Sequence, residues 1–458
     1  MITLLIAVPL ALAFATVAFP KASKYILPIA LIFNLVLLFG FLKPGTLVQV
    51  GNWPAAYGIA LLLDNVNYPF LLFVNILLLA ISLTADFKEK HGILLLVLTA
   101  SLNGLLLTGD FFNSFVFLEI ISAIAYILAA EKKNSYAAFK YLIFGAVAGT
   151  LYLIGAVTVY VYAGTLNMGY ASFIVAPQYM EIAGIFMLLA LLIELKVLPL
   201  GLWAPDVYSN GSSLTPVVLG TAVTASIFYL FARIFFTITL PVRFELVFIL
   251  STISIIVAQL AALKQKNLGR ALAYMAIAGA STVVAALSAA VHGEDTLLSA
   301  AFFYLFADVV SVFVLFSIFA YLSHKGFKGN TTVGLAFTIA SLSIIGLPLT
   351  AGFWAKINLL QSLFEMNNLI LPAVLLISTV IEAGYLIKWN VELWYKDQEE
   401  QEDESYIPFG TQLVVLLLAL VLIIVGFMPQ LITDKTHSIA TSLTDFRTYF
   451  DTLLKGGM

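Results

Sequence analysis

The chain has 458 residues, of which 62% are hydrophobic and only 10% are charged, and its formal net charge is −3. Soluble domains carry roughly 25% charged residues. The composition therefore excludes an ordinary soluble domain and predicts an all-α, polytopic membrane protein.

Apolar stretches long enough to span a bilayer recur along the whole sequence. We place about fourteen transmembrane helices, numbered 1 to 14 in chain order, near residues 2–19, 25–42, 66–84, 92–108, 112–130, 138–162, 180–204, 214–236, 244–262, 269–290, 296–322, 332–364, 369–390 and 409–431. The first stretch lacks a basic start and a small-residue cleavage site, so we interpret it as a retained helix rather than a signal peptide.

Basic residues are divided unevenly between alternate connections. The odd-numbered connections and their flanks contain fourteen lysine and arginine residues, whereas the even-numbered ones contain only Lys43, Arg233 and Arg243. Because cytoplasmic loops are enriched in basic residues, the odd connections are predicted to be cytoplasmic. We therefore expect a multi-pass protein of the plasma membrane with both termini outside.

A single carboxylate, Glu119, lies in the middle of the fifth apolar segment. It follows Asp110 by nine residues and precedes Glu131 by twelve, so a helix places it deep in the hydrocarbon layer. An acid at that depth is costly and is expected to face a polar cavity or a partner charge rather than lipid. We expect a functional role; the alternative is a neutral acid that only joins two helices.

Two segments are interrupted in a similar way. Segment 7 contains IELKVLPLGLWAPD (193–206) and segment 12 contains GLPLTAGFWAK (346–356). Proline removes a helical donor, and the freed backbone groups are tolerated at depth only beside protein or a water-lined cavity. Glu194 and Lys196 accompany the first break, and Lys356 follows the second. Paired breaks are typical of transporters, whereas kinks that serve packing alone would not explain the charges.

Other ionisable residues are less distinctive. Asp308 and Glu382 lie inside apolar segments, where they either extend a polar path or are satisfied structural acids. We interpret a second group, which lies near segment ends, as hydrated side chains: Asp64, Asp110, Asp206 and Arg233.

The C-terminal part contains two further features. An acidic run over residues 396–405 is interpreted as a solvated cytoplasmic loop. After the last segment, apolar residues recur at helical spacing, which predicts an amphipathic helix in the membrane interface or docked on a neighbour: Ile439, Leu443, Phe446, Phe450 and Leu453.

Cysteine is absent, and the four histidines fall in or near connections between apolar segments. Iron–sulfur clusters need thiolate ligands, and membrane haems need axial histidines within the helices. We therefore expect no cofactor, no metal and no redox or catalytic centre in this chain, so any electron transfer would belong to a partner.

Several motifs carry a resemblance to a known family. They are GNWPAAYGIALLLDNVNYPF (51–70), GDFFNSFVFLE (109–119), LWAPDVYS (202–209), QKNLGRALAYMAIAG (265–279) and GLPLTAGFWAK (346–356). These stretches resemble the antiporter-like membrane subunits that are shared by respiratory complex I, Mrp-type cation/proton antiporters and energy-converting membrane-bound hydrogenase and sulfur-reducing complexes. The Mrp D-type chain and its relatives are the most similar.

The resemblance implies two inverted five-helix half-channels, helices 4 to 8 and 9 to 13, joined by a polar axis. It also implies other membrane subunits and a peripheral redox arm as partners. Glu119 matches the family's fifth-helix glutamate, and Lys356 matches its twelfth-helix lysine. The seventh-helix lysine falls on Glu194, and Lys196 can replace it only if the break rotates Lys196 inward.

Other positions depart from the family pattern. The family's eighth-helix lysine and tenth-helix histidine fall on Ala225 and Gly279, and no lysine follows Asp308. A Lys–Glu pair supplies the coupled protonation that a proton path needs. We accordingly expect Glu119 to lie within hydrogen-bond or one-water reach of a basic group of segment 7, for which Lys196 is the candidate.

Three functions follow as hypotheses. The first is a subunit that translocates protons or sodium within a multisubunit complex, and the second is the same fold with a degenerate channel in a structural or coupling role. The third, a stand-alone secondary transporter, would carry substrate-sized polar clusters. The expected division is 1–91 (helices 1 to 3), 92–240 and 241–395 (the half-channels), and 396–458 (acidic loop, helix 14 and tail).

Overall fold

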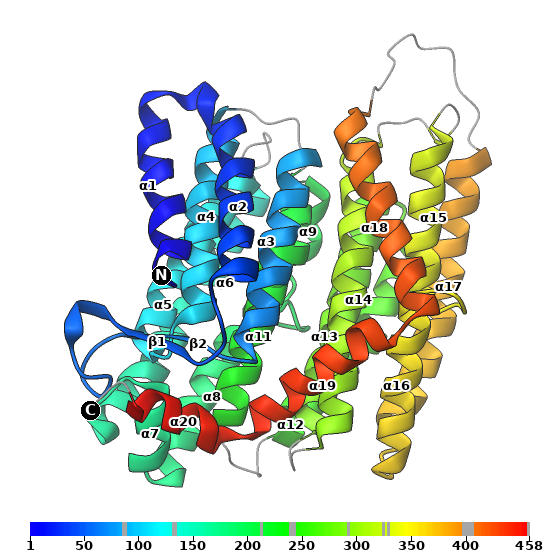
Figure 1. Ribbon diagram of the computed structural model, residues 1–458. Helices are drawn as coiled ribbons and strands as arrows, with labels where there is room; N and C mark the ends of the chain where they lie inside the picture. Colours follow the sequence, from blue (N-terminus) through cyan, green and yellow to red (C-terminus); the bar gives the residue numbers. More distant parts are fainter. Residues whose placement is uncertain are drawn as a thin grey trace.

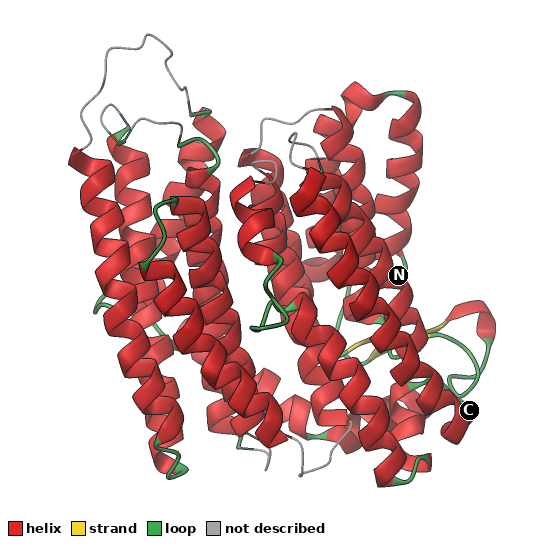
Figure 2. Ribbon diagram, turned by 180° about the vertical axis from the view of Figure 1, so that it is seen from behind, coloured by secondary structure: helices red, strands yellow, loops and turns green. Residues whose placement is uncertain are grey.

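The computed structural model describes the chain except for residues 85–88, 131–134, 211–213, 238–243, 291–293, 323–325, 328–329, 396–406 and 456–458. The described part is nearly all helical, with long helices running roughly side by side (Figures 1 and 2). Arg243 and the acidic run of residues 396–405 lie outside the described residues.

The N-terminal helices coincide with the predicted apolar segments. They are α1 (Leu4–Ala18), α2 (Ser23–Gly40), α3 (Asn67–Thr84), α4 (Glu89–Leu107), α5 (Phe111–Ala129) and α6 (Ser135–Ala163), with short turns η1 (Pro20–Ala22) and η2 (Val50–Asn52). A two-stranded antiparallel hairpin, β1 (Thr46–Gln49) and β2 (Ala60–Leu63), connects α2 to α3, with Thr46 opposite Leu63. The sequence analysis did not predict this hairpin.

The next segments are divided into shorter pieces. Segment 7 comprises α8 (Pro177–Glu194) and α9 (Ala204–Asn210), preceded by the short α7 (Met168–Ile174). Segment 8 comprises α10 (Leu214–Val218), the π-helical turn η3 (Leu219–Val223) and α11 (Thr224–Thr237). The remaining helices are α12 (Phe244–Leu263), α13 (Leu268–Ala289), α14 (Asp295–Phe319), α15 (Thr331–Ile345), α16 (Ala351–Glu365), α17 (Ile370–Tyr395), α18 (Phe409–Phe427), α19 (Gln430–Thr444) and α20 (Phe446–Lys455).

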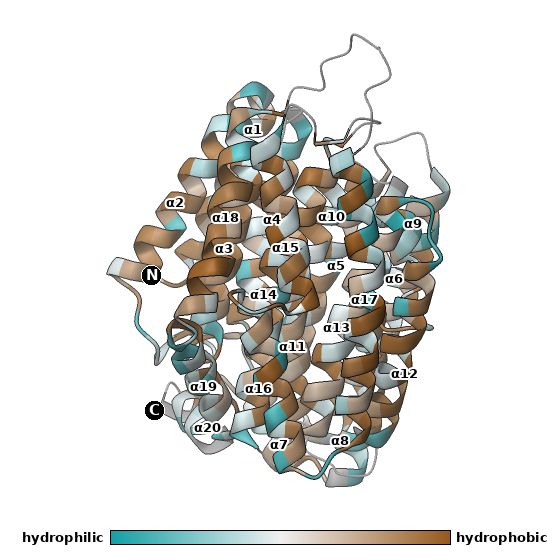
Figure 3. Cartoon of the chain, turned by 90° about the vertical axis from the view of Figure 1, so that its right-hand side faces the viewer, coloured by the Kyte–Doolittle hydropathy of each residue, from teal (hydrophilic) through white to brown (hydrophobic). Residues whose placement is uncertain are grey.

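Within the described residues, eleven helices are long and apolar enough to cross a membrane. Burial separates the central helices from the peripheral ones. In the apolar stretch of Leu214–Thr237, 100% of the residues are buried, and in that of Leu268–Ala289 94% are. In Ser135–Ala163 only 33% are buried. A helix that is apolar on all sides belongs in the centre of a bundle. The protein therefore has its core around α10, η3, α11 and α13, whereas outer helices such as α6 expose apolar side chains, among them Phe139 and Tyr160. Hydrophobic residues run along most of the helices (Figure 3).

The C-terminal tail packs on its own chain. Helix α19 runs obliquely across the bundle and α20 continues toward the hairpin (Figure 1). Ile439, Leu443 and Leu453 are 0%, 3% and 0% exposed, and Leu453 packs with Tyr449 and the hairpin residue Leu62. The prediction of an interfacial helix or one docked on a neighbour was therefore wrong for this face, because the bundle itself covers it. The side chain of Phe446 lies outside the described part of the chain.

The tail also covers a charged pair that we had interpreted as hydrated. Arg233 of α11 forms an ion pair with Asp64, and their side chains are 4% and 17% exposed. The guanidinium carbon lies 4.5 Å from the ring centroid of Tyr449 and 5.4 Å from that of Tyr229. Asp110, which caps the N-terminus of α5, is buried as well, at 7% exposed. These side chains are buried because α20 closes over the segment ends.

Candidate ion pathway

The first break positions a lysine through an unusual backbone conformation. Helix α8 ends at Glu194, and Lys196 adopts a positive φ of 58°. The Lys196 and Val197 N–H groups donate to the Ile193 and Leu192 carbonyls at 3.0 Å each, which is a Schellman-type helix end with lysine in the position that glycine usually occupies. The left-handed residue turns its side chain away from the surface, so Lys196 is 1% exposed.

Lys196 is directed at the π-helical turn of segment 8. Its Nζ donates to Thr224 Oγ1 at 2.6 Å and lies 5.5 Å from the ring centroid of Tyr208. Thr224 Oγ1 in turn donates to the Leu219 carbonyl at 2.6 Å. The condition for Lys196 to act in place of the family's lysine, an inward rotation at the break, is met by this geometry.

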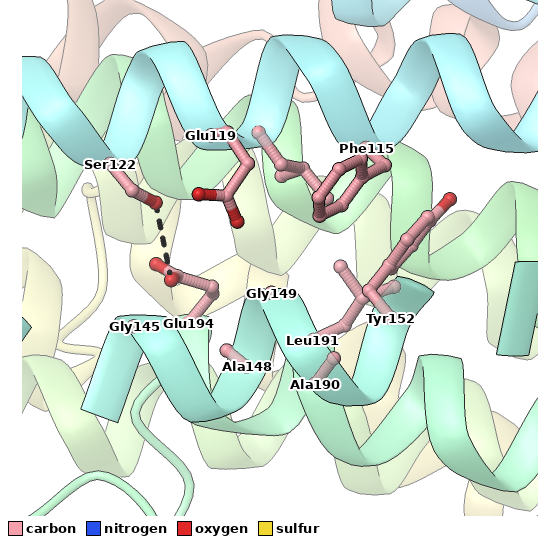
Figure 4. A pocket seen from close by; sticks show the side chains of 11 residues that line it. Phe115, Glu119, Ser122, Gly145, Ala148, Gly149, Tyr152, Ala190, Leu191 and Glu194 are labelled. Carbon is pink, nitrogen blue, oxygen red and sulfur yellow. Dashed lines mark hydrogen bonds between the residues drawn. The ribbon is translucent and has the colours of Figure 1, made fainter. Parts of the chain in front are cut away.

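Glu119 and Glu194 face each other across a small pocket between α5, α6 and α8 (Figure 4). Ser122 Oγ donates to Glu194 Oε1 at 3.4 Å. Small residues on α6 leave room for the two acids: a Cβ added at Gly149 would lie 2.0 Å from Glu119 Oε1. The pocket therefore exists because α6 presents glycine and alanine at this depth.

The expected hydrogen bond between Glu119 and Lys196 is absent. Among the described residues, Glu119 forms no hydrogen bond and no ion pair with a basic group, and it belongs to the exposed face of α5 together with Phe112 and Val116. The expectation that Glu119 is buried was therefore wrong, and the direct hydrogen bond to Lys196 does not form; contact through one water stays a prediction. The physical reason is the end of α8: Glu194 is its last helical residue and points toward α5, whereas the left-handed residue Lys196 points toward α11.

Asp308 of α14 packs against α13. A Cβ added at Gly279 would lie 2.5 Å from Asp308 Oδ1, so the missing side chain on α13 is what makes room for this carboxylate. Asp308 interacts electrostatically with both Lys196 and Lys356. It shares a pocket with Lys356, which Ser343, Gly352 and other residues of α14 to α16 also line.

The second break positions Lys356. Helix α15 ends at Ile345, Gly346 and Leu349 have positive φ values of 83° and 73°, and α16 begins at Ala351. A Cβ added at Gly346 would lie 2.9 Å from Lys356 Cδ, so the lysine stem crosses the break where glycine leaves room. Its Nζ donates to the Ile345 carbonyl at 3.3 Å, one of the groups that the break frees from the helix.

Lys356 is ion-paired to Glu382 of α17. The Nζ lies 2.7 Å from Glu382 Oε2, with side chains 13% and 4% exposed, and also donates to Thr379 Oγ1 at 3.0 Å. Gln259 of α12 donates to Glu382 Oε1 at 2.9 Å. Our sequence analysis did not single out Gln259, although an amide inside an apolar helix is a usable signal.

The six candidate residues lie in one series. Glu119 and Glu194 line one pocket, Asp308 and Lys356 line a second, and Lys356 forms the ion pair with Glu382; Lys196 follows Glu194 by two residues and lies within electrostatic range of Asp308. The series begins on α5, passes both helix breaks and ends on α17. In the described part of the chain, no three His, Asp or Glu side chains gather as a metal site.

Outside the spanning helices, Asp206 joins three segment ends. Its carboxylate accepts from Lys140 Nζ at 2.7 Å and from Arg270 Nη1 at 2.6 Å, and its side chain is 19% exposed. Partial burial alone would raise the pKa of Asp206, but the hydrogen bonds and charges of Lys140 and Arg270 outweigh it and hold the pKa below the ordinary value of 3.8. The positive-inside rule predicted all three residues to be on one side of the membrane, and their contact agrees with that.

Comparison with known proteins identifies the family. Residues 108–382 match the family described as NADH:quinone oxidoreductase/Mrp antiporter, TM. The chain belongs to this family. It is therefore an antiporter-like, multi-pass membrane protein, and the matched range extends from Thr108, just before α5, to Glu382 on α17.

Relatives of this antiporter-like chain cover nearly its whole length. NADH-quinone oxidoreductase subunit N of Flavobacterium psychrophilum is 26% identical over 447 residues, which is 90% of this chain and 95% of the relative. The D-type chain of the Na(+)/H(+) antiporter of Alkalihalophilus pseudofirmus is 26% identical, covering 90% and 88% of the two chains. A chain of the membrane-bound sulfane sulfur reductase, an archaeal respiratory complex, matches with a TM-score of 0.89 and 25% identity, covering 99% of each chain. A chain of the Mrp complex from Dietzia sp. has the same fold, with a TM-score of 0.89, 21% identity and 99% coverage of each chain.

Proposed function

We propose that this protein translocates protons or sodium as one subunit of a multisubunit membrane complex. The named relatives are subunits of a quinone oxidoreductase and of a cation/proton antiporter, and the similar solved chains come from multisubunit assemblies. The observation that carries the proposal is the buried Lys356–Glu382 ion pair beside Asp308 in the second half, together with the Glu119 and Glu194 carboxylates that line one pocket in the first half. Intramembrane ionisable residues that pair with one another mark ion pathways.

The finer architecture is part of the same proposal. The chain forms about fourteen spans with two inverted five-helix repeats, 92–240 and 241–395, flanked by residues 1–91 and 396–458. Each proposed repeat contains one broken helix with a lysine at or after its break, which supports the division. Both termini lie outside in this proposal, because the basic connections are then cytoplasmic.

In the proposed mechanism, Lys356 is the residue that exchanges the ion. Its ammonium is bound by Glu382 and shares a pocket with Asp308, so a proton released from it has carboxylates on two sides. Lys196 and Asp308 connect this site to the first half of the chain. A proton path requires such neighbouring groups whose charges respond to one another.

A specific observation supports a second candidate function, a structural or coupling subunit with a degenerate channel. The first half pairs two acids, Glu119 and Glu194, instead of an acid and a lysine. Gly279 also provides no titratable group where the family has histidine. Under this alternative, the second half retains its ion pair only for stability, since buried pairs that lose one partner are destabilised.

Ion flux through variants of Lys356 separates the two functions. In reconstituted vesicles that contain the intact complex, Lys356→Ala should abolish coupled ion movement, and Lys356→Arg should block it by keeping a permanent charge. Lys388→Ala is the matched control. Lys388 is also a helical lysine, on the spanning helix α17, but it is 54% exposed and its ion pair with Glu392 is long, at 3.9 Å, so its loss should have little effect. If both Lys356 variants transport as well as the Lys388 control, the degenerate-channel function replaces the proposed one.

A further inference from the structure

Each of the two Glu382 carboxylate oxygens accepts a hydrogen bond from a side chain of another helix. Lys356 Nζ donates to Oε2 at 2.7 Å and Gln259 Nε2 donates to Oε1 at 2.9 Å. The same Gln259 amide nitrogen donates to Ser378 Oγ at 3.0 Å, and the Tyr385 hydroxyl donates to Gln259 Oε1 at 2.9 Å. Gln259, Tyr385 and Glu382 are 1%, 1% and 3% exposed.

Tyr385 determines which way the Gln259 amide faces. An amide has one accepting oxygen and one donating nitrogen, so a hydroxyl that donates to Oε1 leaves the NH₂ group facing Glu382 and Ser378. The NH₂ group cannot accept a hydrogen bond. A proton on Glu382 Oε1 would then face another donor inside the protein, where an unsatisfied polar group is costly.

The other oxygen has different chemistry. Glu382 Oε2 faces the Lys356 ammonium, which becomes an acceptor once it loses a proton. A proton can therefore pass between Lys356 Nζ and Glu382 Oε2 without leaving two donors opposed. Three further titratable side chains interact with Glu382: Tyr304, Asp308 and Tyr385.

We infer that Gln259 is a positioning residue, held in place by Tyr385, that confines proton exchange at Glu382 to the oxygen that faces Lys356. Nothing in the family comparison assigns a role to this glutamine. Its importance for transport rests on the proposed function, but the protonation of Glu382 can be measured without any ion movement.

Infrared spectroscopy of the purified full chain or complex tests the inference. Glu382→Gln identifies the carboxyl C=O stretch that belongs to Glu382. Gln259→Leu removes the donor from Oε1. In the inferred state the proton of the neutral acid sits on Oε2 and Oε1 is the carbonyl oxygen, so losing the Gln259 hydrogen bond should shift the Glu382 C=O stretch to higher frequency. Tyr385→Phe frees the amide to rotate and should cause a smaller frequency shift in the same direction.

Ser378→Ala is the matched control, because it removes another partner of the same amide without touching Glu382. Its Glu382 band should stay at the wild-type frequency. If Gln259→Leu and Tyr385→Phe both behave like Ser378→Ala, the inference is overturned. Should Gln259→Leu fail to fold, Tyr385→Phe decides alone, since it removes only one hydroxyl. Altered infrared bands with no ion flux in the wild type would instead contradict the proposed function and leave the inference standing.

Discussion

Replacing Asp64 by Asn tests whether the tail seals a buried ion pair. The substitution keeps the local turn, because the Asp64 Oδ1 atom that accepts from the N–H groups of Val66 and Asn67 at 2.9 and 2.8 Å has an equivalent in the amide oxygen. It removes the charge opposite Arg233, whose side chain is 4% exposed. Loss of one partner of a buried pair costs about 3–5 kcal/mol, and the 17% exposure of Asp64 places this case near the lower end, about 3 kcal/mol.

The free energy of unfolding, measured by denaturant titration in mixed micelles, provides the readout. Asp206→Asn is the comparison, because its partners Lys140 and Arg270 are 26% and 35% exposed and such pairs contribute about 0–1 kcal/mol each. Combining Asp64→Asn with Arg233→Met should recover most of the lost stability, since no buried charge remains. The reasoning is refuted if Asp64→Asn costs no more than Asp206→Asn, because the Arg233 end of α11 would then be hydrated.

Three further predictions follow from the same geometry. Gly149→Ala should displace the Glu119 carboxyl, whose Oε1 would lie 2.0 Å from the new Cβ, and reduce ion flux while changing stability by no more than about 1 kcal/mol; unchanged flux would show that Glu119 is not on the path. Because the pKa of Asp206 is lowered in the folded protein, its contribution is present above its ordinary value and is lost as pH falls, so the stability difference between wild type and Asp206→Asn should narrow below about pH 4. A difference that stays constant would contradict the ion pairs. Single cysteines at Ser135 and Ser442 should react with impermeant reagents from opposite sides of the membrane, and labelling from one side would contradict the proposed topology.

The helices and both breaks could be predicted because their causes are local in sequence. A spanning helix needs a run of apolar residues, and Pro199 and Pro348 each interrupt one. The ion pair and the burial of Arg233 could not be predicted in this way. Its ion pair joins residues 169 positions apart, and its burial depends on Tyr449 from the tail. Spacing along the sequence contains no information about such contacts.

The different directions of the Glu194 and Lys196 side chains show another limit of sequence reasoning. Residue spacing gives the direction of a side chain only while the helix continues, and α8 ends at Glu194. Two residues later the sign of φ decides the direction, and Lys196 adopts a positive φ although it is not glycine. A non-glycine residue in that region is strained by about 1–3 kcal/mol, and such strain clusters at functional sites. The hydrogen bond from Lys196 Nζ to Thr224 Oγ1 holds the side chain in this direction. The break thus turns Glu194 toward α5 and Lys196, two residues later, toward α11, which supports the proposed path between Glu119 and the site at Lys356.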